Sequence, residues 1–438
     1  MRDVVKAILM VILSAVMASV VLTGVYLLPT ERMKNHVESS IEIFYQEETY
    51  PQQVAGYKLS QLDNETDAIM LLNAVYPKGE MGALKAAMSV PRIDFSNDYS
   101  GRSELVSWLW LHKQPDKVTE YGRYWHGYLL FLKPLLLLLD YADIRILNMI
   151  VQLFLFAYLI VSMVEKGYKK YLIPLLVTEA IINPVAIAMS LQFSSIYYIV
   201  ILSLLYICNQ DREKLLEKDF MLFTLLGIAT AFFDFLTYPL ATLGMAAVFM
   251  LIKNMEENDW KKNLLLVMKW CVFWGIGYAG MWASKWVIAS LVLQENIMLE
   301  VFRQATVHTS DVVIMGQRYN ILQVVWRNIK VFAKWPYLLL GVGIGVWAVK
   351  NHVKLEIRKW KQIIPFLTVA VLPVLWLMIL KEHSGLLYWF TYRGLMVTAF
   401  SLLCGLWGLG VSGQSMKNDR SAFYYRLLTQ ESEVTFGR

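Results

Sequence analysis

Long apolar runs separated by short charged connectors dominate this sequence. The first run covers residues 7–28 and is long enough to cross a hydrocarbon core of about 30 Å as a helix. With 57% hydrophobic residues, the chain is predicted to be an all-α polytopic membrane protein with about ten transmembrane helices. The other predicted spans are residues 146–164, 172–189, 196–208, 220–233, 240–252, 264–293, 329–349, 363–380 and 386–411.

The net charge of +6 reflects the connectors between these runs and need not imply a nucleic-acid partner. Three to five Lys or Arg residues occur in each of the connectors 165–171, 209–219, 253–262 and 350–361, whereas the alternate connectors near Gln192 and Asp234 contain none. Cationic loops favour the cytoplasmic side of a membrane. We therefore expect the basic connectors and both termini in the cytoplasm of a bacterial cell.

Two segments qualify this topology. Val16-Met17-Ala18 resembles a cleavage site, but the apolar run continues past it, so we interpret the first run as an uncleaved anchor. Residues 125–139 are short for a span and contain Lys133-Pro134, which favours an interfacial or re-entrant helix on the outer leaflet. The predicted organisation is an anchor helix (1–28), an extracytoplasmic loop with interfacial helices (29–145), a transmembrane bundle (146–411) and a cytoplasmic tail (412–438).

Acidic residues collect on the predicted outer side. Asp234 interrupts an apolar stretch, where an ionisable group is costly and often functional, although a turn or cap residue is the alternative. In the outer loop, the five residues from Asp63 to Asp67 lead into an apolar helical pattern, so Thr66 or Asp67 is expected to cap a helix. Capping explains only one of the clustered acids. The candidate catalytic carboxylates are Asp67, Asp234 and Glu31, with Asp94 and Asp98 further along the loop.

Cationic side chains in or beside the outer ends of the spans are candidates for binding a phosphate. Lys285 lies in the outer half of the run 264–293, where snorkelling to the interface is the alternative. Arg393 enters the last span near its outer end, where interfacial anchoring is the alternative. Arginine suits phosphate because its planar fork donates two parallel hydrogen bonds. The candidate phosphate-binding residues are Lys285, Arg393, Arg318 and Arg123.

Aromatic and polar residues mix in Tyr121-Gly122-Arg123-Tyr124-Trp125-His126-Gly127-Tyr128, where the outer loop meets the membrane. An aromatic belt and a site for a sugar or lipid phosphate are the two interpretations of this segment. His383 is expected in an exposed loop, either solvated or acting as an acid, base or phosphate ligand. The candidate substrate-binding residues are Tyr124, Trp125, His126, His383 and Tyr392.

Together these residues predict an outward-facing cavity with carboxylates above and cations below, at the depth of the lipid headgroups. Transfer of a sugar from a polyprenyl phosphate to an extracytoplasmic acceptor would use both kinds of group. A carboxylate would take the proton of the acceptor hydroxyl, while Lys and Arg would stabilise the leaving phosphate. No phosphate-binding loop of the type GxxxxGK[ST] occurs, which argues against an ATP-driven pump.

This layout of one span, a long acidic outer loop and a helical bundle resembles the GT-C superfamily of polytopic membrane glycosyltransferases. Segments that look like signatures of its bacterial members are Thr66-Asp67-Ala68, Arg123-Tyr124-Trp125-His126-Gly127, Phe233-Asp234-Phe235-Leu236-Thr237 and Phe390-Thr391-Tyr392-Arg393. The resemblance implies a catalytic acid in the first outer loop, here Asp67 or Glu31, and inversion at the anomeric carbon.

The resemblance also implies the partners. These are a polyprenyl-phosphate sugar donor, a lipid bilayer and a glycan acceptor such as a cell-surface polysaccharide, teichoic acid or glycolipid. No Asp-x-Asp pair occurs in the outer loop, and the three cysteines lack metal-ligand spacing. No metal site is therefore predicted, and dependence on a divalent cation is left open.

A non-enzymatic transporter or flippase of a lipid-linked saccharide is the alternative function. Transporters commonly contain two related halves and broken helices near the membrane midplane. This sequence shows no half-repeat, and its polar residues gather at one face, which favours the enzyme. A polysaccharide polymerase would share the lipid donor, and the sequence does not separate it from a simple transferase or identify the sugar.

Overall fold

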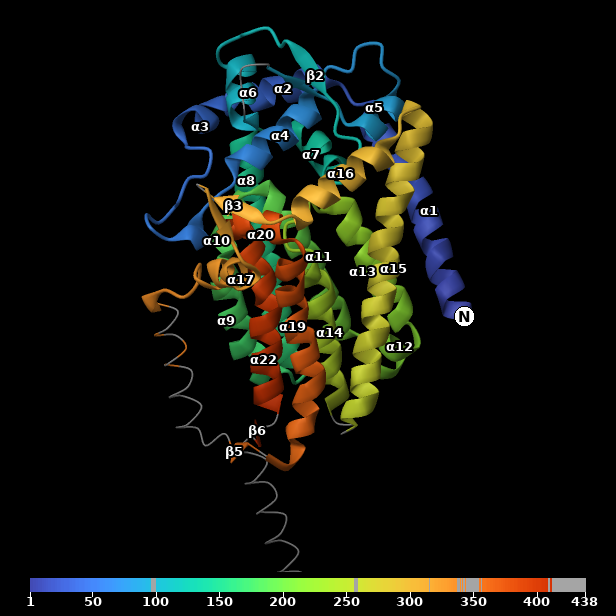
Figure 1. The fold of residues 1–438 in the computed structure, drawn as a ribbon, viewed down its shortest axis with the longest axis vertical. Coiled ribbons are helices and arrows are strands. Elements are labelled where there is room, and N and C mark those ends of the chain that lie inside the picture. The colour runs from blue at the N-terminus through green and yellow to red at the C-terminus, as the bar shows by residue number, and fades with distance from the viewer. Residues whose placement is uncertain are drawn as a thin grey trace, which may run out of the picture.

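A computed structural model describes residues 1–95, 100–255, 259–314, 316–336, 339, 341, 343, 354–355, 357–408 and 410–411. In this part of the chain, a cap of short helices sits on one end of a bundle of long apolar helices (Figure 1). The strands described there are short and pair antiparallel, β1 with β2, β3 with β4 and β5 with β6. The all-α prediction is confirmed.

Five helical segments of the described chain are long and apolar enough to cross a membrane, whereas about ten spans were predicted. They are α1 (Arg2–Val25), α8 (Tyr141–Glu165), α11 (Leu191–Asn209), α15 (Trp260–Leu293) and Trp360–Ile379, which contains α19 (Ile364–Ile379). Shorter apolar helices are α13 (Asp219–Phe233) and α14 (Leu240–Asn254). About half of the predicted span 329–349 lies outside the described residues.

Two predicted spans are divided in the structure. The run 172–189 splits into α9 (Leu172–Ile182) and α10 (Pro184–Met189), because Asn183 adopts a left-handed φ of 56° and Pro184 has no N–H to continue a helix. The last run, 386–411, starts where α20 (Lys381–Leu386) ends and divides into α21 (Tyr388–Thr391), the 3₁₀ helix η5 (Tyr392–Leu395) and α22 (Met396–Gly408). Continuous hydropathy alone does not reveal either break.

The cap is built from the segment between α1 and α8. Within the cap, α7 (Leu129–Leu136) covers only 8 residues. The buried Lys133 of α7 donates to the Ala74 carbonyl oxygen at 2.7 Å and so fixes α7 in place. The elements of the cap are α2 (Thr30–Ser39), α3 (Ile41–Gln46), η1 (Lys58–Ser60), α4 (Asn64–Val75), α5 (Ala83–Ser89), β1 (Arg92–Asp94), α6 (Gly101–Leu109), β2 (Lys117–Thr119) and α7 (Leu129–Leu136).

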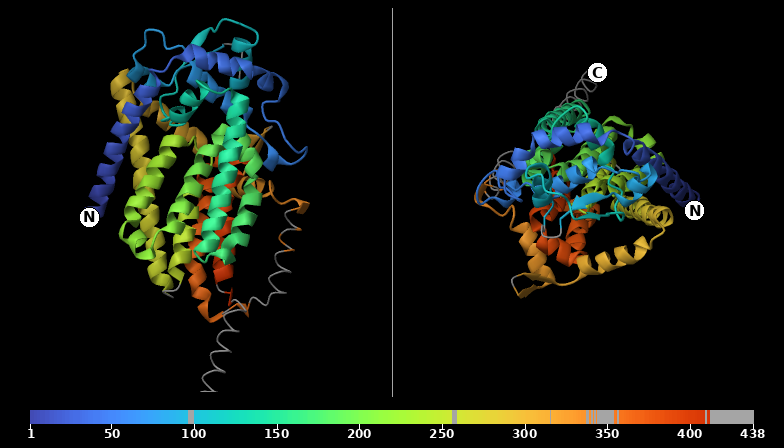
Figure 2. Two further views of the ribbon diagram at one scale, coloured as in Figure 1. Left: turned by 180° about the vertical axis from the view of Figure 1, so that it is seen from behind. Right: turned by 90° about the horizontal axis from the view of Figure 1, so that it is seen from above.

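A second set of short elements follows α15. α16 (Ile297–Thr309) runs along one edge of the molecule below the cap, from the end of α15 to the hairpin of β3 (Val312–Ile314) and β4 (Gln317–Tyr319) (Figures 1 and 2). α17 (Ile321–Ile329) comes next. The remaining elements are η2 (Lys169–Tyr171), α12 (Arg212–Glu217), β5 (Lys354–Leu355), η4 (Ile357–Ile363) and β6 (Gly410–Val411).

Glycines allow α13 and α15 to pack closely. A Cβ atom on Gly227 would lie 2.2 Å from the Trp274 carbonyl oxygen, and one on Gly277 would lie 2.2 Å from the Thr224 carbonyl oxygen. Small residues at such a crossing let two helix backbones touch. This contact fixes the end of α13, and the turn that follows it, against the half of α15 that lies beside the cap.

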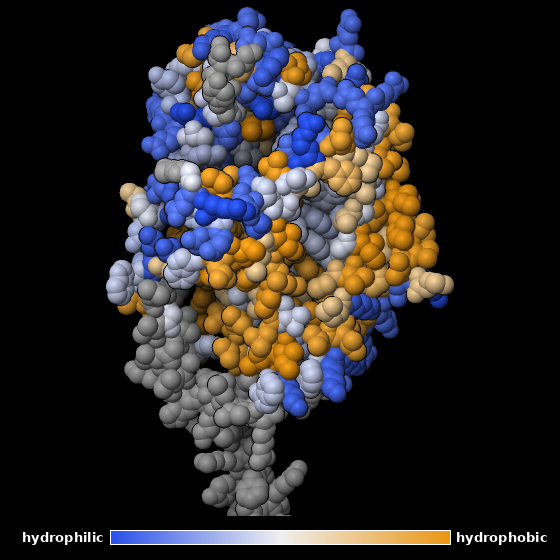
Figure 3. Space-filling model, viewed as in Figure 1, coloured by the Kyte–Doolittle hydropathy of each residue, from blue (hydrophilic) through white to orange (hydrophobic). Residues whose placement is uncertain are grey.

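The surface divides by hydropathy in the same way as the fold. Hydrophobic side chains cover much of the bundle, whereas hydrophilic side chains dominate the cap (Figure 3). Many apolar side chains on α1 and α8 are exposed, among them Leu13, Val20, Leu153 and Phe154. A lipid environment would cover such a surface.

Candidate functional site

The turn between α13 and α14 is the point where the cap, the bundle and α20 meet. α13 ends at Asp234, whose carboxylate accepts hydrogen bonds from the Thr237 hydroxyl and, at 3.2 Å, from the Thr237 amide. Leu236 has a left-handed φ of 62°, and α14 begins after Pro239. Asp234 is 3% exposed, so the turn holds a buried carboxylate at the cap end of the bundle.

The aromatic segment 121–128 packs directly on this turn. The Gly127 amide donates to the Phe232 carbonyl oxygen at 2.9 Å, and a Cβ atom there would lie 2.5 Å from that oxygen. The Phe235 ring lies 5.6 Å from the Tyr124 ring and 4.9 Å from the His126 ring, measured between centroids. Only glycine therefore permits the close approach that gathers these aromatic groups.

The half of α15 that lies beside the cap completes this arrangement. The Trp125 indole donates to the Met281 carbonyl oxygen at 2.8 Å, and the Trp286 indole donates to the Arg123 carbonyl oxygen at 3.0 Å. The Tyr124 and Trp282 rings lie 4.9 Å apart. The structure thus brings four of the predicted residues together: Arg123, Tyr124, Trp125 and His126 lie between the Asp234 turn and α15.

Figure 3 shows a hollow of near-neutral hydropathy below α16, between α15 and the helices α19 and α20. We name the group formed by Tyr124, Asp234, Tyr278 and Trp282 the aromatic recess. The Trp282 ring lies 4.9 Å from the Tyr124 ring and 6.1 Å from the Tyr278 ring, measured between centroids. Asp234 lies within electrostatic range of the Tyr124 and Tyr278 hydroxyls. The Tyr278 hydroxyl and the Trp282 indole nitrogen are buried and make no hydrogen bond of normal geometry in the described part of the chain. Polar atoms left open beside aromatic faces suit a ligand with many hydroxyl groups.

His126 supports this region from inside. Its Nε2 lies 3.0 Å from the Tyr121 carbonyl oxygen and its Nδ1 lies 3.3 Å from the Tyr128 hydroxyl. Burial, followed by the nearby charge of Lys285, lowers the pKa of His126 well below its ordinary value. The imidazole is therefore neutral at physiological pH, and it positions the aromatic segment.

His383 reaches the same turn from α20. It is 5% exposed, so the expectation of an exposed loop histidine is wrong. Its Nε2 lies 2.9 Å from the Leu236 carbonyl oxygen, and its Nδ1 has no hydrogen-bond partner among the described atoms. Burial lowers the pKa of His383 to about 4. A neutral imidazole with one open nitrogen thus faces the Asp234 turn.

Lys285 does not snorkel toward water. The side chain is fully buried and donates to the Met88 carbonyl oxygen at 2.9 Å and to the Ala87 carbonyl oxygen at 3.2 Å. Its ammonium also lies 5.4 Å from the centre of the Trp125 ring. Lys285 therefore closes the C-terminal end of α5 and joins the cap to α15.

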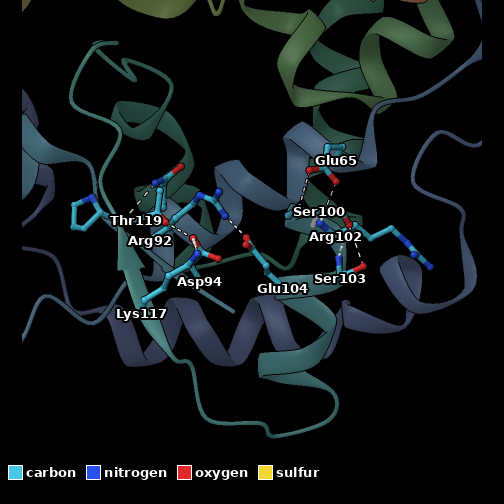
Figure 4. Close-up of polar contacts among 12 residues, drawn as sticks. Glu65, Arg92, Asp94, Ser100, Arg102, Ser103, Glu104, Lys117 and Thr119 are labelled. Carbon is cyan, nitrogen blue, oxygen red and sulfur yellow. Dashed lines mark hydrogen bonds and ion pairs between the residues drawn. The ribbon is translucent and has the colours of Figure 1, made fainter. Parts of the chain in front are cut away.

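The acids of residues 63–67 serve three different helices, and we name Asp63, Glu65 and Asp67 the acid cluster. Asp63 is the N-cap of α4 and accepts from the Thr66 amide at 2.9 Å, so the prediction of Thr66 or Asp67 as the N-cap is wrong. Glu65 accepts from the Gly101 amide at 2.7 Å, at the start of α6 (Figure 4). Each carboxylate satisfies amides that a helix start leaves open.

Asp67 performs this task for α11. Its oxygens accept from the Leu191 amide at 3.0 Å, the Gln192 amide at 3.1 Å and the Tyr141 hydroxyl at 2.6 Å. Asp67 is fully buried, and this burial raises its pKa, while Arg145 opposes the shift. The carboxylate therefore fixes α11 and α8 to the cap and is directed away from the aromatic recess.

Arg393 is fully buried and joins three segments. It donates to the carbonyl oxygens of Trp389 at 3.0 Å, Ile182 at 3.3 Å and Leu59 at 3.4 Å, and its guanidinium lies 4.0 Å from the Phe193 ring centre. The adjacent Tyr392 is also buried. These contacts place Arg393 behind the Asp234 turn rather than in the aromatic recess.

The remaining predicted residues are dispersed. Arg123 forms an ion pair with Glu300 of α16 at the rim of the recess. Arg318 is exposed on β4 and pairs with Asp311. Glu31 is exposed in the first turn of α2, and Asp98 lies outside the described residues.

A polar cluster in the cap was not predicted. Arg92 pairs with Glu104, while Asp94 accepts from the Thr119 hydroxyl and lies 3.4 Å from the Lys117 ammonium (Figure 4). Burial and a hydrogen bond with Asp94 raise the pKa of Glu104. The pairing of β1 with β2 brings Asp94 close to Lys117 and Thr119, and Glu104 joins them from α6. No local sequence pattern indicates this meeting.

The described residues contain no group of three or more His, Cys, Asp or Glu side chains that could hold a metal ion, and no step below relies on one. Comparison of the chain with protein-family models, curated proteins and solved structures finds no match.

Proposed function

We propose that the protein is a membrane-embedded glycosyltransferase that takes a sugar from a polyprenyl-phosphate donor and passes it to an extracytoplasmic glycan. The aromatic recess carries this proposal. It combines a buried carboxylate with aromatic faces and open hydrogen-bond donors, at the boundary between an apolar bundle and a polar cap. A sugar on a lipid carrier requires both environments side by side.

The donor would lie across this boundary. Its polyprenyl tail would occupy the lipid-facing side of α15 and α19, and its sugar would stack in the aromatic recess. Arg123 is the cation best placed for the phosphate, because it lies at the rim and its partner Glu300 is itself 39% exposed. Lys285 and Arg393 are less suited, since backbone carbonyl groups already accept from both.

Asp234 is the carboxylate best placed to act as the general base. The acceptor oxygen would bond to the anomeric carbon as the bond from that carbon to the phosphate oxygen breaks. Polyprenyl phosphate would leave with the electron pair, and the acceptor proton would pass to Asp234. Asp67, the other candidate base, is already used to hold α11, so a loss of activity in its variants would follow from a loss of structure.

Sugar transfer by the purified protein in nanodiscs tests this proposal, with a panel of radiolabelled polyprenyl-phosphate sugars as donors. Asp234→Asn is expected to lower the transfer rate by on the order of 10²–10⁴-fold while the protein stays folded. Asp219→Asn is the matched control. Asp219 is equally buried at the opposite end of α13 and contacts Lys269 and Trp270. Full activity of folded Asp234→Asn protein would reject Asp234 as the base.

One observation favours the second candidate, a flippase for a lipid-linked saccharide. The break at Asn183 divides an apolar run into two half-helices, a feature of many transporters. A flippase would move a fluorescent lipid-linked sugar between the leaflets of a vesicle without releasing polyprenyl phosphate. Release of polyprenyl phosphate in step with sugar transfer would instead support the transferase.

A further inference from the structure

A cavity separate from the aromatic recess opens between the β3–β4 hairpin and α20. Its volume is about 660 Å³. It is lined by Asp311, Arg318, Tyr319, Asn320, Ile321, Leu322, Gln323 and Lys381. Polar and charged side chains therefore form one wall, while the first residues of α17 form the other.

The charged wall contains two cations and one anion. The Lys381 ammonium lies 2.7 Å from one carboxylate oxygen of Asp311, and the Arg318 guanidinium pairs with the other oxygen. Hydrogen bonds from Lys381 and Arg318 lower the pKa of Asp311, so the carboxylate is ionised at neutral pH. The three side chains together leave one positive charge facing the cavity.

A ligand can easily replace Asp311 as the partner of the Arg318 guanidinium. Arg318 is 74% exposed, and ion pairs this exposed contribute little to stability. A phosphate group entering the cavity would accept two parallel hydrogen bonds from the guanidinium, a stronger arrangement. Tyr319 offers an aromatic ring beside these cations for contact with a sugar.

We propose that this cavity binds a phosphate-bearing glycan. If the proposed function is correct, the glycan is the acceptor, because α20 connects the cavity to the aromatic recess. Lys381 begins α20, and His383, two residues later, contacts the Leu236 carbonyl oxygen of the Asp234 turn. The cavity would thus hold the charged part of an acceptor whose reacting end extends toward Asp234.

Binding of a fluorescent glycerol-phosphate oligosaccharide to the full chain in nanodiscs tests the proposal. The double variant Arg318→Gln/Lys381→Gln is expected to bind at least tenfold more weakly, and Asp311→Asn about threefold more tightly because a competing carboxylate is removed. Arg303→Gln is the control, since Arg303 is an exposed cation on α16 outside the cavity. The control is expected to bind as the unmodified chain does.

Three results would overturn the assignment. They are unchanged binding by the double variant, equal binding of a neutral oligosaccharide of the same length, and displacement of the probe by equimolar inorganic phosphate, which would indicate a site for free phosphate. This assay measures binding and not sugar transfer. A chain that binds the probe but transfers no sugar would therefore reject the proposed function and keep the cavity assignment.

Discussion

The aromatic recess and the acid cluster both contain buried carboxylates at the cap end of the molecule, yet their surroundings differ. In the acid cluster, Asp63, Glu65 and Asp67 each accept from backbone amides at the start of a helix. In the aromatic recess, Asp234 caps only its own turn, while the nearby Tyr278 hydroxyl and Trp282 indole interact with each other and make no hydrogen bond of normal geometry to the described residues.

This difference separates structural from functional polarity. A buried polar group with all its partners holds the fold together, whereas a buried polar group with poor partners calls for another explanation, of which binding of a ligand is one. The acid cluster fixes the positions of α4, α6 and α11. The aromatic recess lies between segments that such contacts have already fixed, so its side chains are free to serve a substrate.

The largest expected effect is on the acid cluster. Asp67→Ala removes the acceptor for two amides and the Tyr141 hydroxyl, which should lower the free energy of unfolding by on the order of 3–5 kcal/mol. Thermal unfolding in detergent measures the change. Asp67→Asn keeps one acceptor oxygen and should lose less. An Asp67→Ala protein with normal stability and no transferase activity would instead assign Asp67 to catalysis.

A smaller loss is expected at Lys285, where the comparison extends to a cation. Lys285→Met keeps the aliphatic length but leaves the carbonyl groups of Ala87 and Met88 without their donor, at a cost of about 1–3 kcal/mol. Measured as unfolding free energy, this loss should come with an unchanged KM for the donor. A raised KM in a fully stable protein would show that Lys285 binds the donor phosphate after all.

The aromatic recess should respond in the opposite way. Tyr278→Phe removes a buried hydroxyl that makes no hydrogen bond of normal geometry in the described chain, so stability should stay nearly constant while donor affinity falls by about tenfold. Tyr141→Phe is the matched variant in the other region, because its hydroxyl contacts Asp67 at 2.6 Å. It should lower stability by about 1 kcal/mol and leave the KM unchanged. Reversed results for these two tyrosines would remove the distinction between the regions.

The sequence predicted the helical class and the position of most long apolar helices, and it singled out residues 121–128 and Asp234 without predicting that they meet. Hydropathy and aromatic clustering are local signals, so they can be read from a single sequence. The same signals did not identify the partners of Lys285, Arg393 and Asp67. Each of these side chains satisfies backbone groups more than 120 positions away along the chain, and residue identity alone contains no record of such pairings.

The break at Asn183 and the burial of His383 were missed for a related reason. Asn183 tolerates a left-handed conformation and Pro184 cannot donate to a helix, but an apolar run conceals both signals. His383 follows two charged residues that suggest an exposed loop, whereas contact with the Leu236 carbonyl oxygen draws it inside. Local polarity therefore predicts exposure poorly where two loops pack on each other.

The smallest expected effect concerns the cap cluster of Arg92, Asp94 and Glu104. Its polar groups have partners, as in the acid cluster, but they are less completely buried. Burial and the hydrogen bond with Asp94 keep the pKa of Glu104 higher in the folded than in the unfolded chain. Between about pH 4.5 and pH 8 the folded chain therefore binds more protons than the unfolded chain, and stability falls as the pH rises through that range, by less than roughly 1.4 kcal/mol per pH unit. Melting temperatures between pH 5 and pH 9 should show this decline, and Glu104→Gln should flatten it.

Glu65→Gln is the control, because Glu65 caps α6 without contacting the cap cluster, and it should leave the slope unchanged. A slope that persists in Glu104→Gln would place the titrating group elsewhere and make Glu104 another fully satisfied structural acid.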